Sequence, residues 1–308
     1  MNRVGVGTCF GSFGELLQGV LPGNHKFLVN CRIQNRSKVT VSLGEPRFSP
    51  VKEEDFARSY ARFPKTYKGL RIFLGDLGRH DDCMITVESD IPVGKGLSSS
   101  TADMVAGVRA LAEALSVKLK SDYVSRMLTE VEPNDGLHFN DTSAYHHTEG
   151  RLIANIDWVP PWRILGIDQG GVMDTVKFNQ RLLSWTEIQM AHYKSMLDTI
   201  LPALTAHDAA RVAGIATESA KAWQSVNPKE DLSAVLDLAE RLGADGVINT
   251  HSGTYLGLLF AETSSTDTEW LAARVGEVLP GRDAGWYMTT GCKFADTAQL
   301  EEKRHSRG

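Results

Sequence analysis

The sequence contains few cysteines, no long apolar run and no excess of positive charge. Four cysteines occur among 308 residues and none belongs to a C-x-x-C pair, so neither a disulfide framework nor a zinc site is expected. No apolar stretch reaches the roughly 18 residues that a membrane-spanning helix needs. The formal net charge of −5 provides no basic field for nucleic acid or an anionic membrane surface. These absences predict a reduced, soluble, cytoplasmic protein that binds neither nucleic acid nor membranes.

The hydrophobic pattern divides the chain into a strand-rich first half and a helix-rich second half. Residues 53–69, with alternating charges and aromatics, are expected to form a loop, and residues 247–262 a strand, a Gly-rich turn and a second strand. This order indicates an α+β fold with two lobes that share a cleft. Other predicted strands cover 4–21, 25–33, 38–44, 83–90, 151–159 and 163–171, and predicted helices cover 99–115, 122–131, 186–204 and 232–243.

One stretch, IPVGKGLSSSTADMVAG at residues 91–107, follows a predicted strand and leads into a predicted helix. The first amides of a helix lack intrahelical acceptors and carry the positive end of its dipole, so such a position binds anions. Gly94 and Gly96 allow the backbone to approach a phosphate closely, and Pro92 stiffens the entry to the turn. The serine hydroxyls can donate to phosphate oxygens or ligate a magnesium ion. The sequence therefore predicts a phosphate-binding turn.

This turn differs from the P-loop of ordinary nucleoside-triphosphatases. Leu97 and Ser98 follow Gly96 where that motif requires Lys and then Ser or Thr. A simpler alternative is that the serines only cap the helix, with residues 101–103 completing the cap. One serine is enough for capping, so three in a row favour the phosphate interpretation.

The segment PVGKGLSSSTA (92–102) resembles the second motif of the GHMP kinase superfamily, whose members include galactokinase, homoserine kinase, mevalonate kinase and phosphomevalonate kinase. The usual form is P-x-G-x-G-L-G-S-S-A-A, so Ser98 replaces the third glycine and Thr101 the first alanine. Residues 7–19 and 243–260 stand where the superfamily has its first and third motifs. They are similar to the branch that includes the L-threonine kinase of cobalamin synthesis. The stretches shared with that branch read GELLQG (14–19), EPND (132–135), GGVMDT (170–175) and HSGTYLGLLF (251–260).

The resemblance implies a two-lobed α+β fold, with an N-terminal lobe like ribosomal protein S5 domain 2 and a helix-rich C-terminal lobe that carries a small sheet. We expect an ATP-binding domain at residues 1–170 and a C-terminal domain at residues 171–308. The resemblance also implies that the turn binds ATP together with Mg²⁺. The expected ATP-binding residues are Pro92, Gly94, Lys95, Gly96, Leu97, Ser98, Ser99, Ser100 and Thr101.

The activity implied by the resemblance is ATP-dependent phosphorylation of a hydroxyl group on a small molecule, with L-threonine favoured as the acceptor and O-phospho-L-threonine as the product. The segment LVNCRI (28–33) stands where the branch has LVT-x-PI, so serine, homoserine or an isoprenoid or sugar alcohol stays open as the acceptor. A nucleotide-binding sensor of the same fold, without turnover, is the alternative from another class. The expected partners are a small-molecule substrate and a second copy of the chain in a homodimer.

Phosphoryl transfer is assisted by a group that receives the proton of the acceptor hydroxyl. Asp135 is the expected base, because superfamily kinases with such a base keep an aspartate in this region, and Asp141 is the competing carboxylate. The alternative for Asp135 is a structural Asx turn, since N-D-G is a common turn sequence. By their order along the chain, the resemblance implies Ser100 and Glu130 as magnesium ligands, with Glu132 as a nearby alternative.

An amino-acid acceptor needs partners for its ammonium and carboxylate groups. Glu15 is expected to pair with the ammonium and Gln18 to hydrogen-bond beside it. Arg32 is the candidate partner of the carboxylate. Ser252 and Gly253 are expected to line the wall of the cleft.

Two further positions stay open at the level of sequence. His251 either touches the substrate or fixes its loop as a buried histidine. Many superfamily members carry a lysine in the first motif that lowers the reaction barrier, and the segment from Phe10 to Phe13 contains none. Lys26 and Lys95 are the candidate substitutes for that lysine.

Overall fold

A computed structural model describes residues 3–44, 53–171, 184–265 and 267–293. The strands are β1 (Arg3–Leu21), β2 (His25–Gly44), β3 (Asp82–Ser89), β4 (Thr142–His146), β5 (Arg151–Ile156), β6 (Trp162–Asp168), β7 (Gly246–Asn249), β8 (Tyr255–Ala261) and β9 (Asp283–Met288). The helices are α1 (Glu53–Arg62), α2 (Pro64–Asp76), α3 (Ser99–Leu115), α4 (Ser121–Val131), α6 (Glu187–Thr205), α7 (Ala209–Ala222), α8 (Leu232–Leu242) and α9 (Thr268–Val278), with a 3-10 turn at Trp223–Ser225. None of these helices combines the length and the apolar character that crossing a membrane requires.

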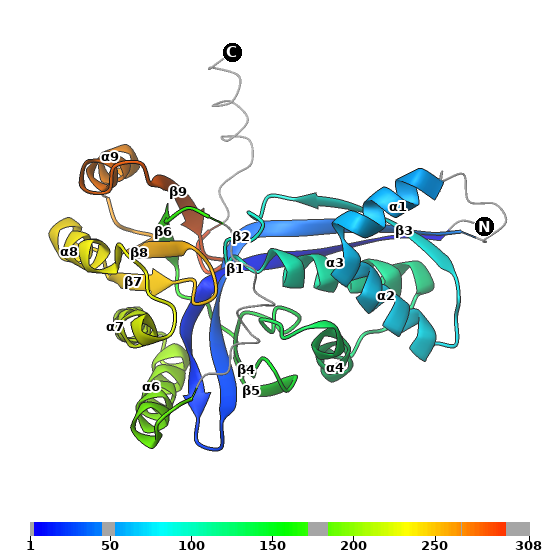
Figure 1. Ribbon diagram of the computed structural model, residues 1–308, viewed down its shortest axis with the longest axis horizontal. Helices are drawn as coiled ribbons and strands as arrows, with labels where there is room; N and C mark the ends of the chain where they lie inside the picture. Colours follow the sequence, from blue (N-terminus) through cyan, green and yellow to red (C-terminus); the bar gives the residue numbers. More distant parts are fainter. Residues whose placement is uncertain (1–2, 45–52, 172–183, 266, 294–308) are drawn as a thin grey trace, which may run out of the picture.

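The strands of the described residues form one nine-stranded sheet. Its order is β5-β4-β2-β1-β7-β8-β6-β9, and β3 pairs with β2 beside this path. Figure 1 shows β1 and β2 extending from one end of the long axis to the centre of the molecule, where they turn toward their hairpin. These two long strands therefore connect the two halves of the molecule.

Two hydrophobic clusters lie on this common sheet. The larger cluster packs α2, α3, α4, α6 and α7 against β1, β2 and β3. The smaller one packs α8 and α9 against β6, β7 and β8, and includes Leu165, Val235, Leu258 and Leu271. In Figure 1, α1 to α4 lie at one end of the long axis and α8 and α9 at the other. The molecule thus has two lobes. The larger core extends from α2–α4 into α6 and α7, and the smaller core lies at the end that carries α8 and α9.

Strand β1 is irregular where the first Gly-rich motif lies. Its pairing with β2 shifts register between Phe10 and Ser12 and on both sides of Glu15. Bulges of this kind bend a strand and re-aim its side chains. Glu15 pairs with Asn30 of β2 on one side and with Asn249 of β7 on the other. Glu15 therefore stands where the two lobes meet.

Helix α3 lies directly on β1. A Cβ atom on Gly7 would come within 2.1 Å of the carbonyl oxygen of Ala106, so a residue without a side chain is required at this crossing. Met104 and Val108 belong to the buried face of the helix, as the 3.6-residue period predicts. The turn before Ser99 reaches the bulged part of β1, since the carbonyl of Leu97 accepts a hydrogen bond from the amide of Ser12 at 3.3 Å.

The α+β class and most of the predicted elements are confirmed. The prediction for residues 53–69 is wrong, because they form α1 and the start of α2 rather than a loop. Tyr67 and Leu74 lie two turns apart on α2 and are both buried. The segment is therefore helical because it buries an apolar face, and its charged residues do not prevent this. The strands predicted at 25–33 and 38–44 are one continuous β2, and β4 and β9 were not predicted.

The predicted domain boundary at residue 170 follows β6 closely. This strand pairs with β8 and β9, which come from beyond the boundary. The described sheet continues through this point, so the structure offers no separate check on the boundary. The division into residues 1–170 and 171–308 stays a prediction.

Candidate active site

The turn between β3 and α3 holds three residues in the left-handed backbone region. The φ angles of Gly94, Gly96 and Ser98 are 73°, 84° and 63°. Glycine adopts this conformation freely, whereas it costs an L-residue such as Ser98 about 1 kcal/mol. Ser98 is the N-cap residue of α3, but its hydroxyl makes no capping hydrogen bond. The first amides of α3 thus lack a side-chain cap, which contradicts the capping alternative and suits an anion.

A second turn, at residues 250–254 between β7 and β8, lies in backbone contact with the first. A Cβ atom on Gly253 would lie 2.1 Å from the carbonyl oxygen of Lys95, and one on Gly96 would lie 2.6 Å from the Cα of Gly253. The amide of Thr254 donates to the same Lys95 carbonyl at 3.1 Å. Glycine at both positions is what permits this approach. Two of the predicted motifs, more than 150 residues apart in the sequence, therefore form one surface.

Asp135 lies against the N-terminal end of α3. Its carboxylate accepts a hydrogen bond from Thr101 Oγ1 at 3.2 Å and another from the hydroxyl of Ser98. Its carbonyl oxygen accepts from Asn30 Nδ2 at 3.1 Å, which ties the backbone to β2. The unusual serine of the turn thus contacts the predicted base.

The N-D-G segment does form an Asx turn, but through a different residue. Asn134 Oδ1 accepts a hydrogen bond from the amide of Gly136 at 3.2 Å, and Gly136 has a φ of 68°. Asn134 closes the turn, and the carboxylate of Asp135 is directed to α3 instead. The Asx turn that was considered for Asp135 is therefore formed by Asn134.

The surroundings of Asp135 favour its protonated form. Burial raises the pKa of Asp135 to about 7, and the negative charge of Glu15 adds to this rise. The hydrogen bonds from Ser98 and Thr101 oppose it, because they stabilise the charged form. A carboxylate in this range can take up and release a proton near neutral pH.

The glutamate beside the turn is Glu132, not Glu130. Ser100 Oγ donates to Glu132 Oε1 at 2.6 Å, and Lys65 Nζ lies 2.5 Å from Glu132 Oε2. Glu130 is exposed in the last turn of α4, whereas the backbone becomes extended at Glu132 and carries that side chain toward α3. The order of residues along the chain could not distinguish these two positions, and the choice of Glu130 is corrected here.

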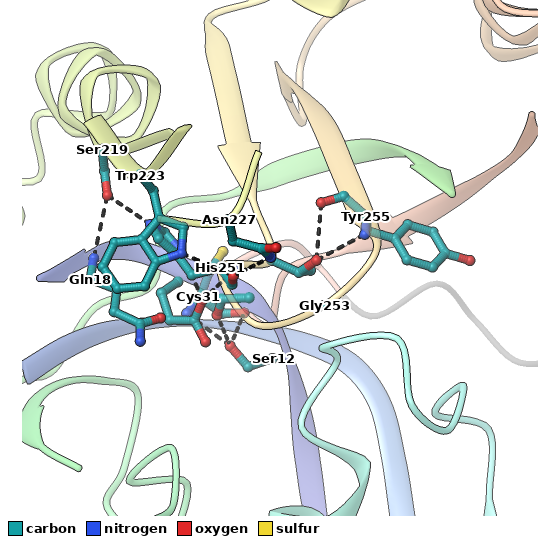
Figure 2. Close-up of polar contacts among 12 residues, drawn as sticks. Ser12, Gln18, Cys31, Ser219, Trp223, Asn227, His251, Gly253 and Tyr255 are labelled. Carbon is teal, nitrogen blue, oxygen red and sulfur yellow. Dashed lines mark hydrogen bonds and ion pairs between the residues drawn. The ribbon is translucent and has the colours of Figure 1, made fainter. Parts of the chain in front are cut away.

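His251 is the centre of a buried hydrogen-bond network, shown in part in Figure 2. Its amide and its Nδ1 both contact Glu15 Oε2, at 3.1 and 2.9 Å, and its Nε2 lies 2.9 Å from Ser219 Oγ. Its carbonyl oxygen accepts from Trp223 Nε1 and Asn227 Nδ2. Both ring nitrogens are used and the side chain is fully buried. Of the two alternatives for His251, the structure favours the histidine that fixes its loop, and here it also orients Glu15.

The other predicted substrate residues differ in what they offer. The amide of Gln18 donates to Ser219 at 3.3 Å, and its buried Oε1 has no hydrogen-bond partner among the described residues. Gln18 thus retains an acceptor for a donor from outside the chain. Ser252 is half-buried, while Gly253 is buried under Lys95 and contributes backbone only.

Comparison with known proteins agrees with this geometry. The family profile described as GHMP kinases N terminal domain matches residues 64–146. The chain is 27% identical over 263 residues to an L-threonine kinase of Salmonella typhimurium, which covers 84% of this chain and 83% of that protein. A homoserine kinase from Cytophaga hutchinsonii superposes with a TM-score of 0.68 at 13% identity over 94% of both chains. The structure of MDDEF in complex with MVAPP, AMPPCP and magnesium superposes with a TM-score of 0.65 at 14% identity, over 94% of this chain and 97% of that one. The chain therefore carries a GHMP kinases N terminal domain at residues 64–146.

The protein is a phosphotransferase with an alcohol group as acceptor, and the fold expected from the resemblance is confirmed. Of the four stretches shared with the threonine kinase branch, one lies in the bulged part of β1, one directly after α4, and one in the turn between β7 and β8 and in β8. The fourth begins at Gly170 and Gly171, directly after β6, and its residues 172–175 lie outside the described part of the chain.

A lysine that was not predicted, Lys229, lies beneath the two turns. Lys229 is only 4% exposed, and its Nζ donates to the carbonyl oxygen of Gly253. Burial lowers the pKa of Lys229 to about 8, although the negative charges of Glu15 and Asp168 act to raise it. The surrounding sequence, NPKED, is typical of an exposed turn, so no local signal indicates this burial.

The two lysines considered from the sequence are placed differently. Lys95 Nζ lies 2.6 Å from Asp168 Oδ2 and also donates to the carbonyl of Gly171 at 2.7 Å. Lys26 pairs with Val20 near the tip of the β1–β2 hairpin. Lys95 is therefore beside the phosphate turn but neutralised by an ion pair, and Lys26 is remote from it.

The remaining candidates, Asp141 and Arg32, belong to a separate group of side chains. Burial, and then a hydrogen bond with Asp157, raise the pKa of Asp141. Arg32 Nη2 donates to the carbonyl of Leu137, and its buried Nε has no partner in the described residues. Asp135, not Asp141, contacts the turn.

The raised pKa of Asp135 predicts a stability change on its replacement. The folded pKa, about 7, exceeds the unfolded value of about 3.9. The ionised carboxylate therefore destabilises the fold above pH 7, and this cost declines as the pH falls from 7 toward 4. We expect Asp135→Asn to raise Tm at pH 8, by an amount equivalent to on the order of a few kcal/mol, and the difference from wild type to shrink toward pH 4. Thermal unfolding between pH 4 and pH 8 measures this.

Asp81 provides a control of the opposite sign. A hydrogen bond from Arg79 holds the pKa of Asp81 below its usual range, so its charge stabilises the fold and Asp81→Asn should lower Tm slightly at pH 8. A lower Tm for Asp135→Asn at pH 8, or a difference that does not vary with pH, would contradict the placement of Asp135.

Proposed function

We propose that the protein transfers the γ-phosphoryl group of ATP to the hydroxyl of L-threonine, giving ADP and O-phospho-L-threonine. The observation that carries this proposal is the hydrogen bonding of Asp135 to Ser98 and Thr101. It joins a carboxylate whose pKa is raised to about 7 to the turn that is suited to phosphate. A base and an anion site in direct contact are what transfer to an alcohol requires.

The backbone of the turn is suited to binding the phosphates of ATP. Gly94 and Gly96 carry no side chain that would block an approaching phosphate, and the first amides of α3 have no side-chain cap. Ser99 is half-buried, and its hydroxyl makes no hydrogen bond with another described residue. Leu97 is fully buried, so it anchors the turn rather than touching the nucleotide.

Ser100 and Glu132 form the pair that fits a magnesium ion. A hydroxyl and a carboxylate oxygen 2.6 Å apart are hard oxygen ligands of the kind that Mg²⁺ takes alongside phosphate oxygens. When bound, Mg²⁺ supplies positive charge against the phosphate oxygens. Lys65 Nζ, 2.5 Å from the other oxygen of Glu132, forms an ion pair with this carboxylate.

The proposed step is a single displacement. The hydroxyl oxygen of the acceptor forms a bond to the γ-phosphorus, the bond from that phosphorus to the bridging oxygen of ADP breaks, and the hydroxyl proton passes to Asp135. Glu15 is the proposed partner of the acceptor ammonium, because His251 holds one of its oxygens in place. The free Oε1 of Gln18 is a second acceptor for the same group.

Two observations favour L-threonine as the acceptor. One is the four stretches shared with the threonine kinase branch, and the other is the similarity to the L-threonine kinase of Salmonella typhimurium over 84% of this chain. The same geometry would serve L-serine or L-homoserine, each of which carries an ammonium and a hydroxyl. A nucleotide-binding sensor without turnover is the alternative from another class, and the raised pKa of Asp135 argues against it, because binding ATP alone does not require a base.

A coupled assay of ADP release with Mg²⁺–ATP tests the proposal against L-threonine, L-serine, L-homoserine, mevalonate, galactose and 1-aminopropan-2-ol. We expect the highest kcat/KM with L-threonine, and a value lower by about 10-fold or more with L-serine, which lacks one methyl group. A higher kcat/KM with any other acceptor would contradict the assignment of L-threonine. ATP binding without turnover on any acceptor would favour the sensor.

The two glutamates at the end of α4 provide a matched pair for the metal site. We expect Glu132→Gln to raise the Mg²⁺ concentration needed for half-maximal turnover by at least about 10-fold, because it removes a charged ligand. Glu130→Gln, two residues away and exposed, should leave it unchanged. Titration of turnover with Mg²⁺ at saturating ATP measures both. Equal effects of the two substitutions would contradict the assignment of Glu132.

A further inference from the structure

A cavity of about 160 Å³ lies between α3, α4 and the turn that follows Asp135. Its apolar wall consists of Val105, Val108, Leu119 and Val124. Its polar lining consists of Arg109, Ser121 and His138. Neither the phosphate turn nor the residues placed around the acceptor line it.

His138 is a buried histidine without hydrogen bonds. Its side chain is 6% exposed, and neither ring nitrogen has a partner among the described residues. The ring is held by aromatic contacts, with Phe139 at a centroid distance of 4.2 Å and Tyr145 at 5.7 Å in a T-shaped arrangement. A buried polar group of this kind is costly unless something pairs with it. The cavity is the space from which a partner can reach it.

The charges around His138 are positive. Arg109 lines the cavity, and Arg32, whose buried Nε also lacks a partner, acts on the same ring from β2. Burial, and then the charges of Arg109 and Arg32, lower the pKa of His138 to about 3, so the ring is neutral and carries one N–H donor. Adding a negative group to the cavity would balance these charges and use that donor.

Helix α4 begins at the cavity. Ser121 is its first residue, and the N-cap residue Lys120 makes no side-chain capping bond. The first amides of an α-helix and the positive end of its dipole attract anions. Asp122, the acidic residue of the first turn, is exposed and does not line the cavity. An arginine, an unpaired histidine and an uncapped helix N-terminus therefore converge on one partly open cavity.

We propose that this cavity binds a small oxyanion, either inorganic phosphate or a carboxylate, between Arg109, His138 and the N-terminus of α4. Arg109 Nη1 donates to the carbonyl oxygen of Thr8 at 2.7 Å, which leaves the Nε and Nη2 edge of its guanidinium group for two oxygens of such an ion. A further oxygen can accept from the ring N–H of His138 or from the first amides of α4. The apolar wall limits the occupant to an ion or a small anionic group.

Nuclear magnetic resonance of the full chain tests this site without any turnover. The ring Cε1–H signal of His138 and the amide signals of Ser121 and Asp122 are followed while sodium phosphate, or separately sodium acetate, is added at constant ionic strength and pH 7. We expect saturable shifts of the ring and of both amides with the same dissociation constant. Shifts with phosphate alone identify a phosphate-type site, and shifts with both ions identify an oxyanion site that also accepts carboxylates.

Arg109→Met should weaken this binding by about 10-fold or more, because a charged, bidentate partner is lost. Arg126→Met is the matched control, since Arg126 lies on α4 over the ring of Tyr123 and does not line the cavity, and it should bind as wild type does. The proposal is overturned if neither ion shifts these signals in the wild-type protein, or if a folded Arg109→Met variant binds unchanged. Should that variant fail to fold, Arg109→Lys replaces it, with weaker binding expected and unchanged binding again overturning the proposal.

Discussion

The contact between the turn before α3 and the turn between β7 and β8 is the constraint on which the site depends. It is a backbone contact, possible only because Gly96 and Gly253 carry no side chain. Lys229 donates a hydrogen bond to the carbonyl oxygen of Gly253. The same turn includes His251, whose ring contacts Glu15 in the bulged part of β1. Through these contacts the turn before α3, the turn between β7 and β8, and Glu15 of β1 are held together.

The chemistry of the site follows from charges that are kept close together and partly out of water. Glu15 and burial together push the pKa of Asp135 up to about 7, while burial brings the pKa of Lys229 down to about 8. Glu132 forms an ion pair with Lys65, and Lys95 forms one with Asp168. The acidic groups near the turn thus have cationic neighbours. The structure gives up some stability in return for a carboxyl group, that of Asp135, which can change protonation near neutral pH.

The sequence predicts best what depends on local pattern. The strand, Gly-rich turn and helix around residues 91–107 are predicted correctly because the turn needs glycine at positive φ angles and the helix needs apolar residues at its 3.6-residue period. It could not choose between Glu130 and Glu132, because the choice depends on where α4 ends. Nor could it find Lys229, which is buried by two turns that are remote in sequence. His251 shows the same limit, since a histidine's partners come from the fold as a whole.

The measurement that tests this account most directly is a paired one on Asp135→Asn, comparing its ATP dissociation constant with its kcat for L-threonine. Because the carboxylate lies beside the phosphate turn without forming it, the account predicts an ATP dissociation constant close to that of wild type. It predicts a kcat lower by about 10²–10⁴-fold, the usual contribution of a general base. A variant that keeps full turnover, or one that loses turnover only because it no longer binds ATP, would contradict the role given to Asp135.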